Sequence, residues 1–558
     1  MKIDDTTPDE GRSPAWSRRS VLGTGLVAGT GLVAGAVPVL AAGQAAAAPS
    51  GSAAQWVTPT GSIIDPRHEL SPPLPDDLIG RAPRVSGSRL RALTPDRRSE
   101  VESSSPGEGR QFSPSSTIPF SFRYDDFAVR DLPVELRPYY RSSPLPLEDT
   151  GTRDTSGVRM MITGGKMYDH PVAQAQYGIA LLESHRLTGN VEYLQRAIKQ
   201  AERLVNRRTL RGTAWFFPYD FNYALHAVHD LFRPPWYSGM AQGQALSLFV
   251  RLHEVTGNSA WRTAADATFA SFLLPPVAGK PWGVWVVDGL LWLEEYPHPE
   301  IVRGDRTYNG HTFAAYGLWD YWRLTGSADA KILLQGALTT ARDVYAAIRN
   351  RSWRSKYCLL HAKDSGNYHT THSIQHTQLY AITGDEYFAR IADVYYTDFP
   401  PIGVKANVRM TAGTHTAYKF SSTGSALGSR SMTLTRNSTA PCTDRLRISG
   451  RSGIWYAISA GTFAGYHLQE TRGARFAIGV NAGMTYLLPR LGTVVPASLT
   501  SYTIDSNGTM VSGATGLVAG DPVSFDMRAV LNGVEHYRLA GGDHAGRWVG
   551  YSAIKPAS

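Results

Sequence analysis

The sequence predicts an α+β multidomain protein in which an (α/α) toroid is followed by a β-rich C-terminal region of two small β modules. Two observations carry this prediction. Amphipathic helical hairpins repeat between about residues 165 and 397, and after Pro400 the chain changes to short alternating segments. A length of 558 residues leaves room for such a division, because domains typically take about 150 residues each.

The first element is a predicted twin-arginine signal peptide, residues 1–48. Arg18 and Arg19 precede an uncharged run rich in Gly and Ala that ends in small residues near Ala48. Gly and Ala dilute the hydrophobicity of this run, and no second apolar run follows, so we expect no integral membrane span after processing. We therefore expect a protein that is secreted or held at the cell surface via the Tat pathway.

Residues 49–115 are rich in Pro, Ser, Gly and Arg and lack sustained periodicity. This composition predicts a linker that is largely disordered. The first folded domain is then expected to span residues 116–398, beginning with an aromatic lead-in around Phe120 and Phe122.

The helical repeat of this domain is marked by a Thr-Gly pair that ends each amphipathic run. A glycine just past a run of 3.6-residue periodicity is a helix stop, and a second helix then returns antiparallel. Hairpins that recur every 60 to 70 residues or so stack into a toroid or solenoid. We favour the incomplete toroid, because long loops between hairpins would line one mouth. The four stops are Leu187–Gly189, Val255–Gly257, Leu324–Gly326 and Ile382–Gly384.

Residues 399–558 alternate β-branched and aromatic residues with Gly, Ser, Asn and Thr, as short strands do. A weak duplication relates the segment from Trp455 to Gly465 with the segment from His536 to Gly546. Two related β modules are the simplest interpretation. Polymer binding and plain structural packing are equally good accounts of their role.

Several enzyme classes leave no trace in the sequence. HExxH, GxSxG, P-loop and paired-cysteine motifs are missing, so we expect no cofactor and no metal ligands. Cys358 and Cys442 fall in different predicted domains, which argues against a disulfide framework. The net charge of +9 would suit an acidic polymer, but a solvated surface rich in Lys and Arg is the more common explanation. Nothing indicates nucleic-acid binding.

The segment Trp353–Tyr380 has the composition of a site, because histidines, tyrosines and cations outnumber large apolar residues. Tyr368 and its neighbours follow a Gly-Asn turn and precede a helical run. Exposed rings and donors are thereby expected at a helix N-terminus, where backbone N–H groups favour an anion. A capped and packed loop-to-helix junction is the structural alternative.

Five motifs in order resemble the D-glucuronyl C5-epimerase family, over about residues 165–395. The resemblance implies a toroid with a cleft for an acidic, uronate-containing polysaccharide, and inversion of C5 of glucuronate to iduronate without a cofactor. It leaves open a homodimer. The motifs are His170–Gly178, Met240–Gln244, Glu294–Pro297, Asn309–Gly310 and Tyr368–His372.

The resemblance also implies roles for individual residues. Tyr296, Tyr368 and Tyr357 match catalytic tyrosines, and Glu295 matches the family's acidic partner. Inversion needs one group to remove the C5 proton and another to return a proton from the opposite face. The expected substrate-binding residues are His372, His369, Lys363, Lys356, Asn309, Gln242, Tyr177 and Trp236.

Two departures from the family keep other functions open. Leu360 stands where the family has an arginine facing the uronate carboxylate, so Lys356, Lys363 or Arg354 would have to replace it. The β region follows the helical domain, whereas the family tends to place one before it. A uronate lyase, which shares the first proton abstraction, and a non-catalytic glycan-binding protein at the cell surface are the alternatives.

Overall fold

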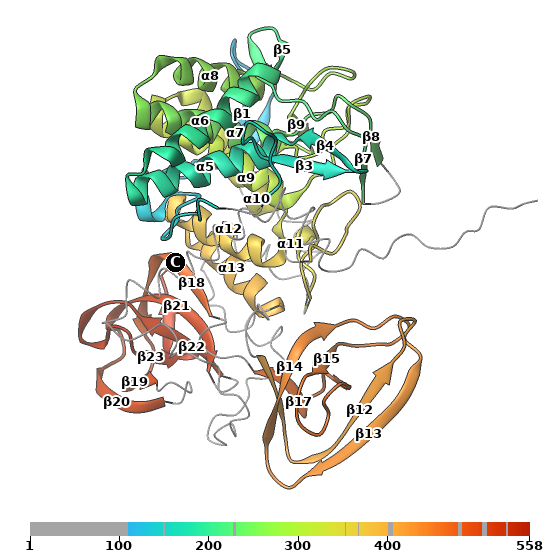
Figure 1. The fold of residues 1–558 in the computed structure, drawn as a ribbon. Coiled ribbons are helices and arrows are strands. Elements are labelled where there is room, and N and C mark those ends of the chain that lie inside the picture. The colour runs from blue at the N-terminus through green and yellow to red at the C-terminus, as the bar shows by residue number, and fades with distance from the viewer. Residues whose placement is uncertain are drawn as a thin grey trace, which may run out of the picture.

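The computed structural model in Figure 1 shows a helical domain, drawn from blue-green to yellow, followed by two β sheets in orange and red. The predicted signal peptide and almost all of the predicted linker lie outside the described residues. The structure describes residues 110–148, 151–226, 230–351, 353–366, 368–399, 406–477, 483–504, 510–531 and 534–557.

The helical domain contains four helical hairpins. One helix of each hairpin packs beside the equivalent helix of the next, in the order α5, α7, α9, α12, and its partner lies outside. This arc of hairpins is the arrangement that an incomplete toroid predicts. The helices are α5 (Pro171–Thr188), α6 (Val191–Arg207), α7 (Gly239–Thr256), α8 (Ser259–Phe269), α9 (Tyr308–Thr325), α10 (Ala328–Asp343), α11 (Tyr345–Ile348), α12 (Tyr368–Thr383) and α13 (Glu386–Asp398).

The predicted helix stops are confirmed. Each inner helix ends at a glycine with φ near +68°, a left-handed conformation that costs a glycine no steric strain. The next residue caps the outer helix with its side chain: Asn190, Asn258, Ser327 and Asp385 each accept a backbone N–H of the first turn. The Thr-Gly pair and the capping residue after it, such as Thr188–Asn190, therefore both end the inner helix and begin the outer helix.

Inner and outer helices differ in burial. The inner helix α9 is buried from Tyr308 to Tyr321, whereas α6 buries one face only. Inner helices also approach closely: a Cβ on Gly243 of α7 would lie 2.4 Å from Ala314 Cα of α9. Any side chain at position 243 would clash at this distance, so the two helices can lie this close only because the residue is glycine.

Short hairpins occupy the loops between the helices. Four of them precede an inner helix in the chain: β3–β4 comes before α5, β5–β6 and β7–β8 before α7, and β9–β10 before α9. The fifth, β1–β2, packs on α10. β1 lies inside the segment predicted as linker, so folded chain begins earlier than expected. The strands are β1 (Arg110–Phe112), β2 (Phe122–Tyr124), β3 (Met160–Thr163), β4 (Lys166–Asp169), β5 (Thr209–Arg211), β6 (Ala214–Phe216), β7 (Tyr223–Leu225), β8 (Asp230–Phe232), β9 (Val284–Val287) and β10 (Leu290–Leu293).

The C-terminal region forms two seven-stranded antiparallel sheets with the same strand order. The first is β13-β12-β16-β15-β14-β11-β17 and the second β20-β19-β23-β22-β21-β18-β24, so each strand has a counterpart seven strands later. This shared topology is what a duplicated module predicts. The strands are β11 (Ala406–Met410), β12 (Gly413–Phe420), β13 (Ala426–Leu434), β14 (Ser438–Leu446), β15 (Trp455–Ile458), β16 (His467–Gln469), β17 (Ala474–Ala477), β18 (Met484–Val494), β19 (Leu499–Ile504), β20 (Met510–Leu517), β21 (Pro522–Leu531), β22 (Val534–Leu539), β23 (Trp548–Gly550) and β24 (Ile554–Pro556).

Both sheets dock on α13 through equivalent arginines. Arg445 pairs across the first sheet with Tyr456, as Arg528 pairs with Tyr537 in the second. Arg445 donates to the carbonyl of Asp398, and Arg528 donates to the carbonyl of Asp393, at 3.1 Å each. The last outer helix is therefore shared between the helical domain and both sheets.

A buried ion cluster completes this interface. Arg490 of β18 donates to the carboxylate of Asp393 at 2.7 Å, and Arg528 lies 3.2 Å from the same carboxylate. Both guanidinium groups are fully buried. Burial alone would raise the pKa of Asp393, but these two cations hold it below its usual value. Asp393 thus shares the compensation of the two buried arginines with Glu386, which pairs with Arg490, and Glu535, which pairs with Arg528.

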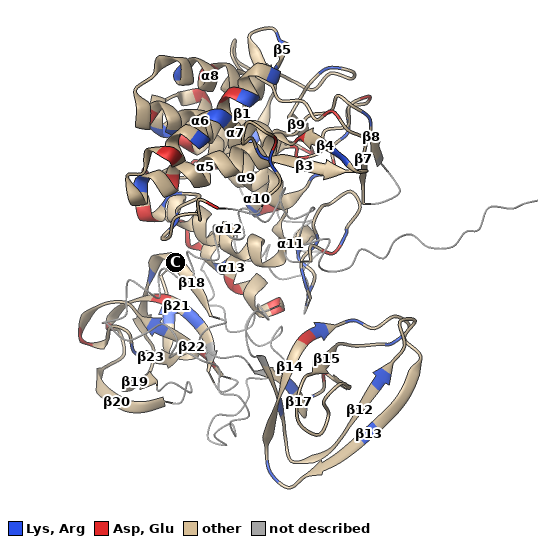
Figure 2. Cartoon of the chain, viewed as in Figure 1, with Lys and Arg blue, Asp and Glu red and all other residues tan. Residues whose placement is uncertain are grey.

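Elsewhere the helical domain carries acidic and basic side chains interleaved, without a single basic face in the view of Figure 2. None of the helices among the described residues is both long and apolar enough to cross a bilayer.

Replacing Asp393 should therefore be costly. Asp393→Asn leaves Arg490 and Arg528 buried with less compensating charge, and we expect it to lower the free energy of unfolding by about 3 kcal/mol. Urea unfolding measures the change. The matched control is Glu300→Gln, which breaks an exposed pair with Arg233 and should cost less than about 0.5 kcal/mol. Equal effects of both variants would contradict the assigned role of Asp393.

Candidate active site

A cavity of about 310 Å³ opens where the inner helices begin. Residues at or just before the N-termini of α5, α7 and α12 line it, as do the loops that precede α7, α9 and α12. The expectation that long loops line one mouth of the helical domain agrees with this position. The polar and aromatic residues that line it include His170, Tyr223, His226, Trp236, Glu295, Tyr296, Tyr357, Lys363 and Tyr368.

Glu295 and Tyr296 leave the end of β10 in a fixed conformation. His311 of α9 accepts the N–H of Leu293 at 3.0 Å and bonds the carbonyl of Ala337 at 2.9 Å, which ties this strand to two helices. Gly310 then leaves room for the Glu295 carboxyl group, because a Cβ there would lie 2.1 Å from Oε2. The Asn-Gly motif at the start of α9 therefore accommodates the acidic residue.

Tyr357 is fixed by backbone pairing with the segment before α9. Its carbonyl accepts the N–H of Tyr308 at 3.0 Å, and its N–H donates to the carbonyl of Lys363 at 2.7 Å. Leu359 and Leu360 continue the pairing with Arg306 and Asp305. A loop that precedes α12 is thus attached to the start of α9, and Tyr357 comes next to Glu295 and Tyr296.

The hydroxyl of Tyr357 lies between two partners. It is 3.4 Å from the Tyr296 hydroxyl and 3.4 Å from each carboxylate oxygen of Glu295. These are long hydrogen bonds, as catalytic contacts often are without substrate. Tyr368, the first residue of α12, places its ring edge-on to that of Tyr357, with centroids 5.2 Å apart. The structure therefore brings together all four predicted catalytic side chains.

Burial sets the protonation of this cluster. It raises the pKa of Glu295 to about 8, and the negative charge of Asp305 adds to the shift, while hydrogen bonds with Tyr296 and Tyr357 oppose it. Burial and the nearby Glu295 also raise the pKa of Tyr296 and Tyr357 well above 10. At neutral pH the phenols are protonated, and Glu295 is the group whose charge changes most readily.

Positive potential at the cavity comes from helix N-termini and one lysine. Lys363 is the only lysine or arginine among the described residues that line the cavity. Of the three cations considered as replacements for the family arginine, Lys356 donates to the carbonyl of Ala347 and Arg354 pairs with Asp364. Leu360 is 38% exposed and is not a lining residue. Lys363 is therefore the candidate partner of a substrate carboxylate.

Four histidine and amide side chains that were predicted to bind substrate do not line this cavity, and each is buried against other residues. His369 accepts the N–H of Ser355 and bonds the carbonyl of Tyr395, and His372 bonds the Ser355 hydroxyl at 2.8 Å. Gln242 bonds Phe217, Trp215 and Ser271, and Asn309 is 1% exposed. Each contributes to packing of the helix starts, which was the structural alternative.

Tyr177 and Lys356 are likewise displaced from the site. The Arg159 guanidinium stacks on the Tyr177 ring, 4.1 Å from its centroid, inside the first hairpin. Trp236, in contrast, lines the cavity and stacks on Tyr219 with centroids 3.9 Å apart. Its ring is 2% exposed, so it forms a wall of the cavity and not a projecting sugar platform.

The β7–β8 hairpin contributes Tyr223 and His226 to the cavity, and neither was predicted from the sequence. Tyr223 stacks on Tyr296, with ring centroids 5.7 Å apart and an interplanar angle of 21°. His226 lies edge-on to Tyr357. No motif pointed to this hairpin, and only its density of aromatic residues could have drawn attention to it.

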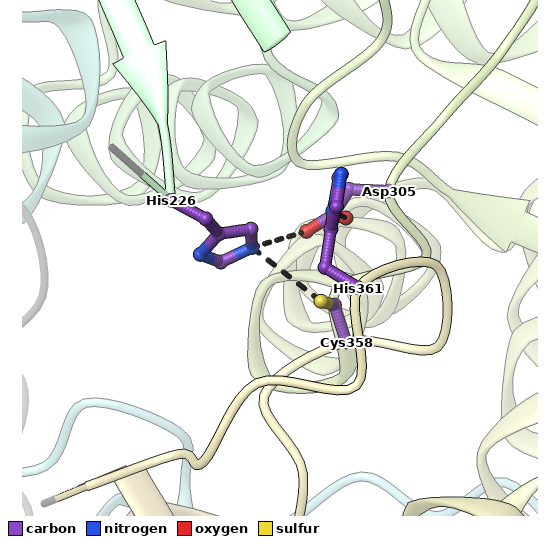
Figure 3. A group of neighbouring side chains, drawn as sticks. All are labelled: His226, Asp305, Cys358 and His361. Carbon is purple, nitrogen blue, oxygen red and sulfur yellow. Dashed lines mark hydrogen bonds and ion pairs between the residues drawn. The ribbon is translucent and has the colours of Figure 1, made fainter. Parts of the chain in front are cut away.

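A second cluster, of residue types that can ligate a metal, adjoins the cavity. His226, Asp305, Cys358 and His361 converge, with one ligand atom of each within 4.8 Å of the others (Figure 3). The spacing Cys358-x-x-His361 was the one signal in the sequence. The other two members come from segments far away along the chain, so spacing alone could not reveal the set.

Comparison with solved structures gives distant similarities. They include cellobiose 2-epimerase from Bacillus thermoamylovorans (17% identity, TM-score 0.32, 41% of this chain and 59% of that one). A family 76 α-mannanase from Bacteroides thetaiotaomicron has 11% identity and TM-score 0.31, over 44% and 61% of the two chains. An unsaturated glucuronyl hydrolase from Bacillus sp. GL1 has 15% identity and TM-score 0.29, over 41% and 62%.

The chain thus spans about three fifths of each of these proteins, and TM-scores this low leave the assignment to the sequence. No curated protein matches the chain. Residues 211–397 match the family model described as D-glucuronyl C5-epimerase C-terminus, which includes all four residues of the tyrosine–glutamate cluster. Over this segment the match confirms the resemblance to the D-glucuronyl C5-epimerase family that the sequence motifs suggested.

Proposed function

We propose that this protein is an exported uronyl C5-epimerase that converts glucuronate to iduronate in a glucuronate-containing polysaccharide. The family match supports a carbohydrate epimerase in general terms. The observation that carries the finer proposal is the contact of the Tyr357 hydroxyl with both Tyr296 and Glu295 inside the cavity. Protonated phenols next to a titratable carboxyl group can act as the general acids and bases that proton exchange at carbon needs.

The difficulty of the reaction lies in the weak acidity of C5–H, which is α to a carboxylate. Removing this proton sends the electron pair of the C–H bond into the carboxylate, which becomes a dianionic enediolate. Positive charge must therefore face the carboxylate in the transition state. Lys363 and the N-termini of α5, α7 and α12 supply it in the proposed complex.

Inversion requires two groups on opposite faces of the sugar. In the proposed direction Tyr296 takes the C5 proton while its own hydroxyl proton passes through Tyr357 to ionised Glu295. Tyr368, which comes from a different element, gives its proton to C5 from the other side. The contacts at 3.4 Å carry the proton from Tyr296 through Tyr357 to Glu295. Before the next turnover Glu295 releases this proton to water, and the Tyr368 phenolate takes up a proton from water. The reverse sequence of the same steps epimerises iduronate.

Heavy-water exchange tests this proposal. We expect deuterium to enter C5 of heparosan or a bacterial glucuronan, seen by NMR, without chain cleavage. A uronate lyase would instead expel the C4 substituent, and absorbance of the unsaturated uronate would rise. Polymer binding with an intact C5–H signal across such a panel would leave the non-catalytic alternative and overturn the proposal.

Removing single hydroxyl groups should separate chemistry from packing. We expect Tyr296→Phe, Tyr357→Phe and Tyr368→Phe each to lower turnover by about 100-fold or more, the scale of lost acid–base catalysis. Initial rates of deuterium incorporation measure this. The matched control is Tyr237→Phe, which loses a hydrogen bond to Thr209 away from the cavity and should lower only stability, by about 1 kcal/mol. Near-normal rates in all three cavity variants would refute the assignment.

The pH profile should report Glu295. Its carboxyl group, with a pKa of about 8, accepts protons only when ionised, so kcat/KM should rise with pH and level off above about 8. In Glu295→Gln this rising limb should vanish together with most of the activity. Glu294→Gln is the control, because the pKa of Glu294 is also about 8 but its carboxylate accepts the N–H of Arg306 outside the cavity. Loss of the limb in the control alone would contradict the role of Glu295.

A further inference from the structure

Four side chains next to the cavity form a compact group of metal-ligand type. Asp305 lies at its centre: its Oδ1 is 2.5 Å from His361 Nδ1, and its Oδ2 is 3.2 Å from His226 Nε2. Cys358 Sγ is 3.4 Å from the same His226 nitrogen. Figure 3 shows all four side chains directed toward one volume, with Cys358 and His361 on one loop and His226 and Asp305 on two other segments.

The surrounding structure holds this group in place. Asp305 and Cys358 are 1% and 0% exposed, and Thr307 donates its hydroxyl to Asp305 at 3.1 Å. The backbone is strained here: His226, Arg306 and Ala362 are non-glycine residues with φ between +49° and +55°. Each lies in the group or directly beside a member of it. Such conformations persist only where neighbouring contacts enforce them.

We propose that His226, Asp305, Cys358 and His361 bind one divalent transition-metal ion, of which zinc is the best match. Two imidazoles, a carboxylate and a thiolate are ligands that zinc accepts in tetrahedral geometry, whereas calcium and magnesium prefer oxygen alone. In a tetrahedral zinc site adjacent ligand atoms lie roughly 3.3–3.8 Å apart. The four atoms, all within 4.8 Å of one another, need only small shifts to reach it.

Charge balance supports the same ion class. One thiolate and one carboxylate carry two negative charges, and two neutral imidazoles add none, so a divalent cation makes the buried site neutral. A neutral ensemble avoids the large cost of an unpaired charge at this depth. Binding releases the thiol proton, since the thiolate is the ligand.

The site assigned here is structural and not catalytic. Four protein ligands close a tetrahedral shell and leave no position for water or substrate. The ion would tie the β7–β8 hairpin, the segment before α9 and the loop before α12 to one point. Tyr357 is adjacent to Cys358, and Lys363 follows His361 by two residues, so the metal would hold both against the cavity. The inference stands apart from the proposed activity, because it concerns ligands and not substrate.

Metal content and cobalt spectroscopy test this directly. The full-length protein, stripped by dialysis and given zinc chloride, should retain about one zinc ion per chain by plasma mass spectrometry. Cobalt(II) in its place should give visible bands of a tetrahedral site and a thiolate charge-transfer band. Cys358→Ser should lose the charge-transfer band. Cys442→Ser, which alters the other buried cysteine in the first β sheet, should keep both signals.

Thermal unfolding provides a second readout that does not need activity. Chelation by phenanthroline should lower the melting temperature of the wild-type protein and of Cys442→Ser, and zinc should restore it. His361→Ala should show no response to either reagent. A protein that retains no zinc or cobalt and does not respond to the chelator would overturn the proposal, and the group would be a plain hydrogen-bonded network. Equal loss of the cobalt signal in Cys358→Ser and Cys442→Ser would also overturn it.

Discussion

The backbone pairing between residues 305–308 and 357–360 is the contact on which the rest of the site depends. Two segments that precede different inner helices are joined there by backbone hydrogen bonds. One side of this pairing faces the cavity and carries Tyr357. The other side carries Cys358, which is paired with Thr307. If the register slipped by one residue, the phenol and the thiol would exchange sides, because alternate residues of an extended segment point in opposite directions.

Burial of the side chains next to this contact sets their protonation states. In water a glutamate side chain has a pKa near 4.5 and a tyrosine a pKa near 10, so at neutral pH the carboxyl group would be ionised and the phenols protonated. Burial raises the pKa of the Glu295 carboxyl group to about 8, so its charge changes close to neutral pH. Burial raises the pKa of the phenols as well, and they remain protonated. Glycines at the helix starts make this burial feasible, since Gly310 admits the carboxyl group of Glu295 against the side of α9. Backbone shape and acid–base behaviour therefore have a common origin.

The sequence was most informative where a local rule decides the structure. Helix stops at Gly189 and its three counterparts follow from backbone conformation alone, and they revealed the hairpin repeat. The tyrosine cluster was also predictable, because its residues stand in motifs. The direction in which a helical residue faces was not: His369 and His372 lie on the same helix as Tyr368, yet α12 turns them into the protein against Ser355 and Tyr395. A helix buried on all sides offers no polar face from which sequence could infer orientation.

The shared helix α13 has a consequence for the order in which the chain can mature. Ala392 and Tyr396 belong to the same apolar core as residues of both sheets, and the arginines that pair with Asp393 in the described part of the chain lie in β18 and β21. A ribosome delivers those partners long after the helix itself has emerged. Until then the last hairpin presents an apolar face and an uncompensated carboxylate to water. The last hairpin therefore completes its packing only after the C-terminal sheets, which are synthesised later, have folded against α13.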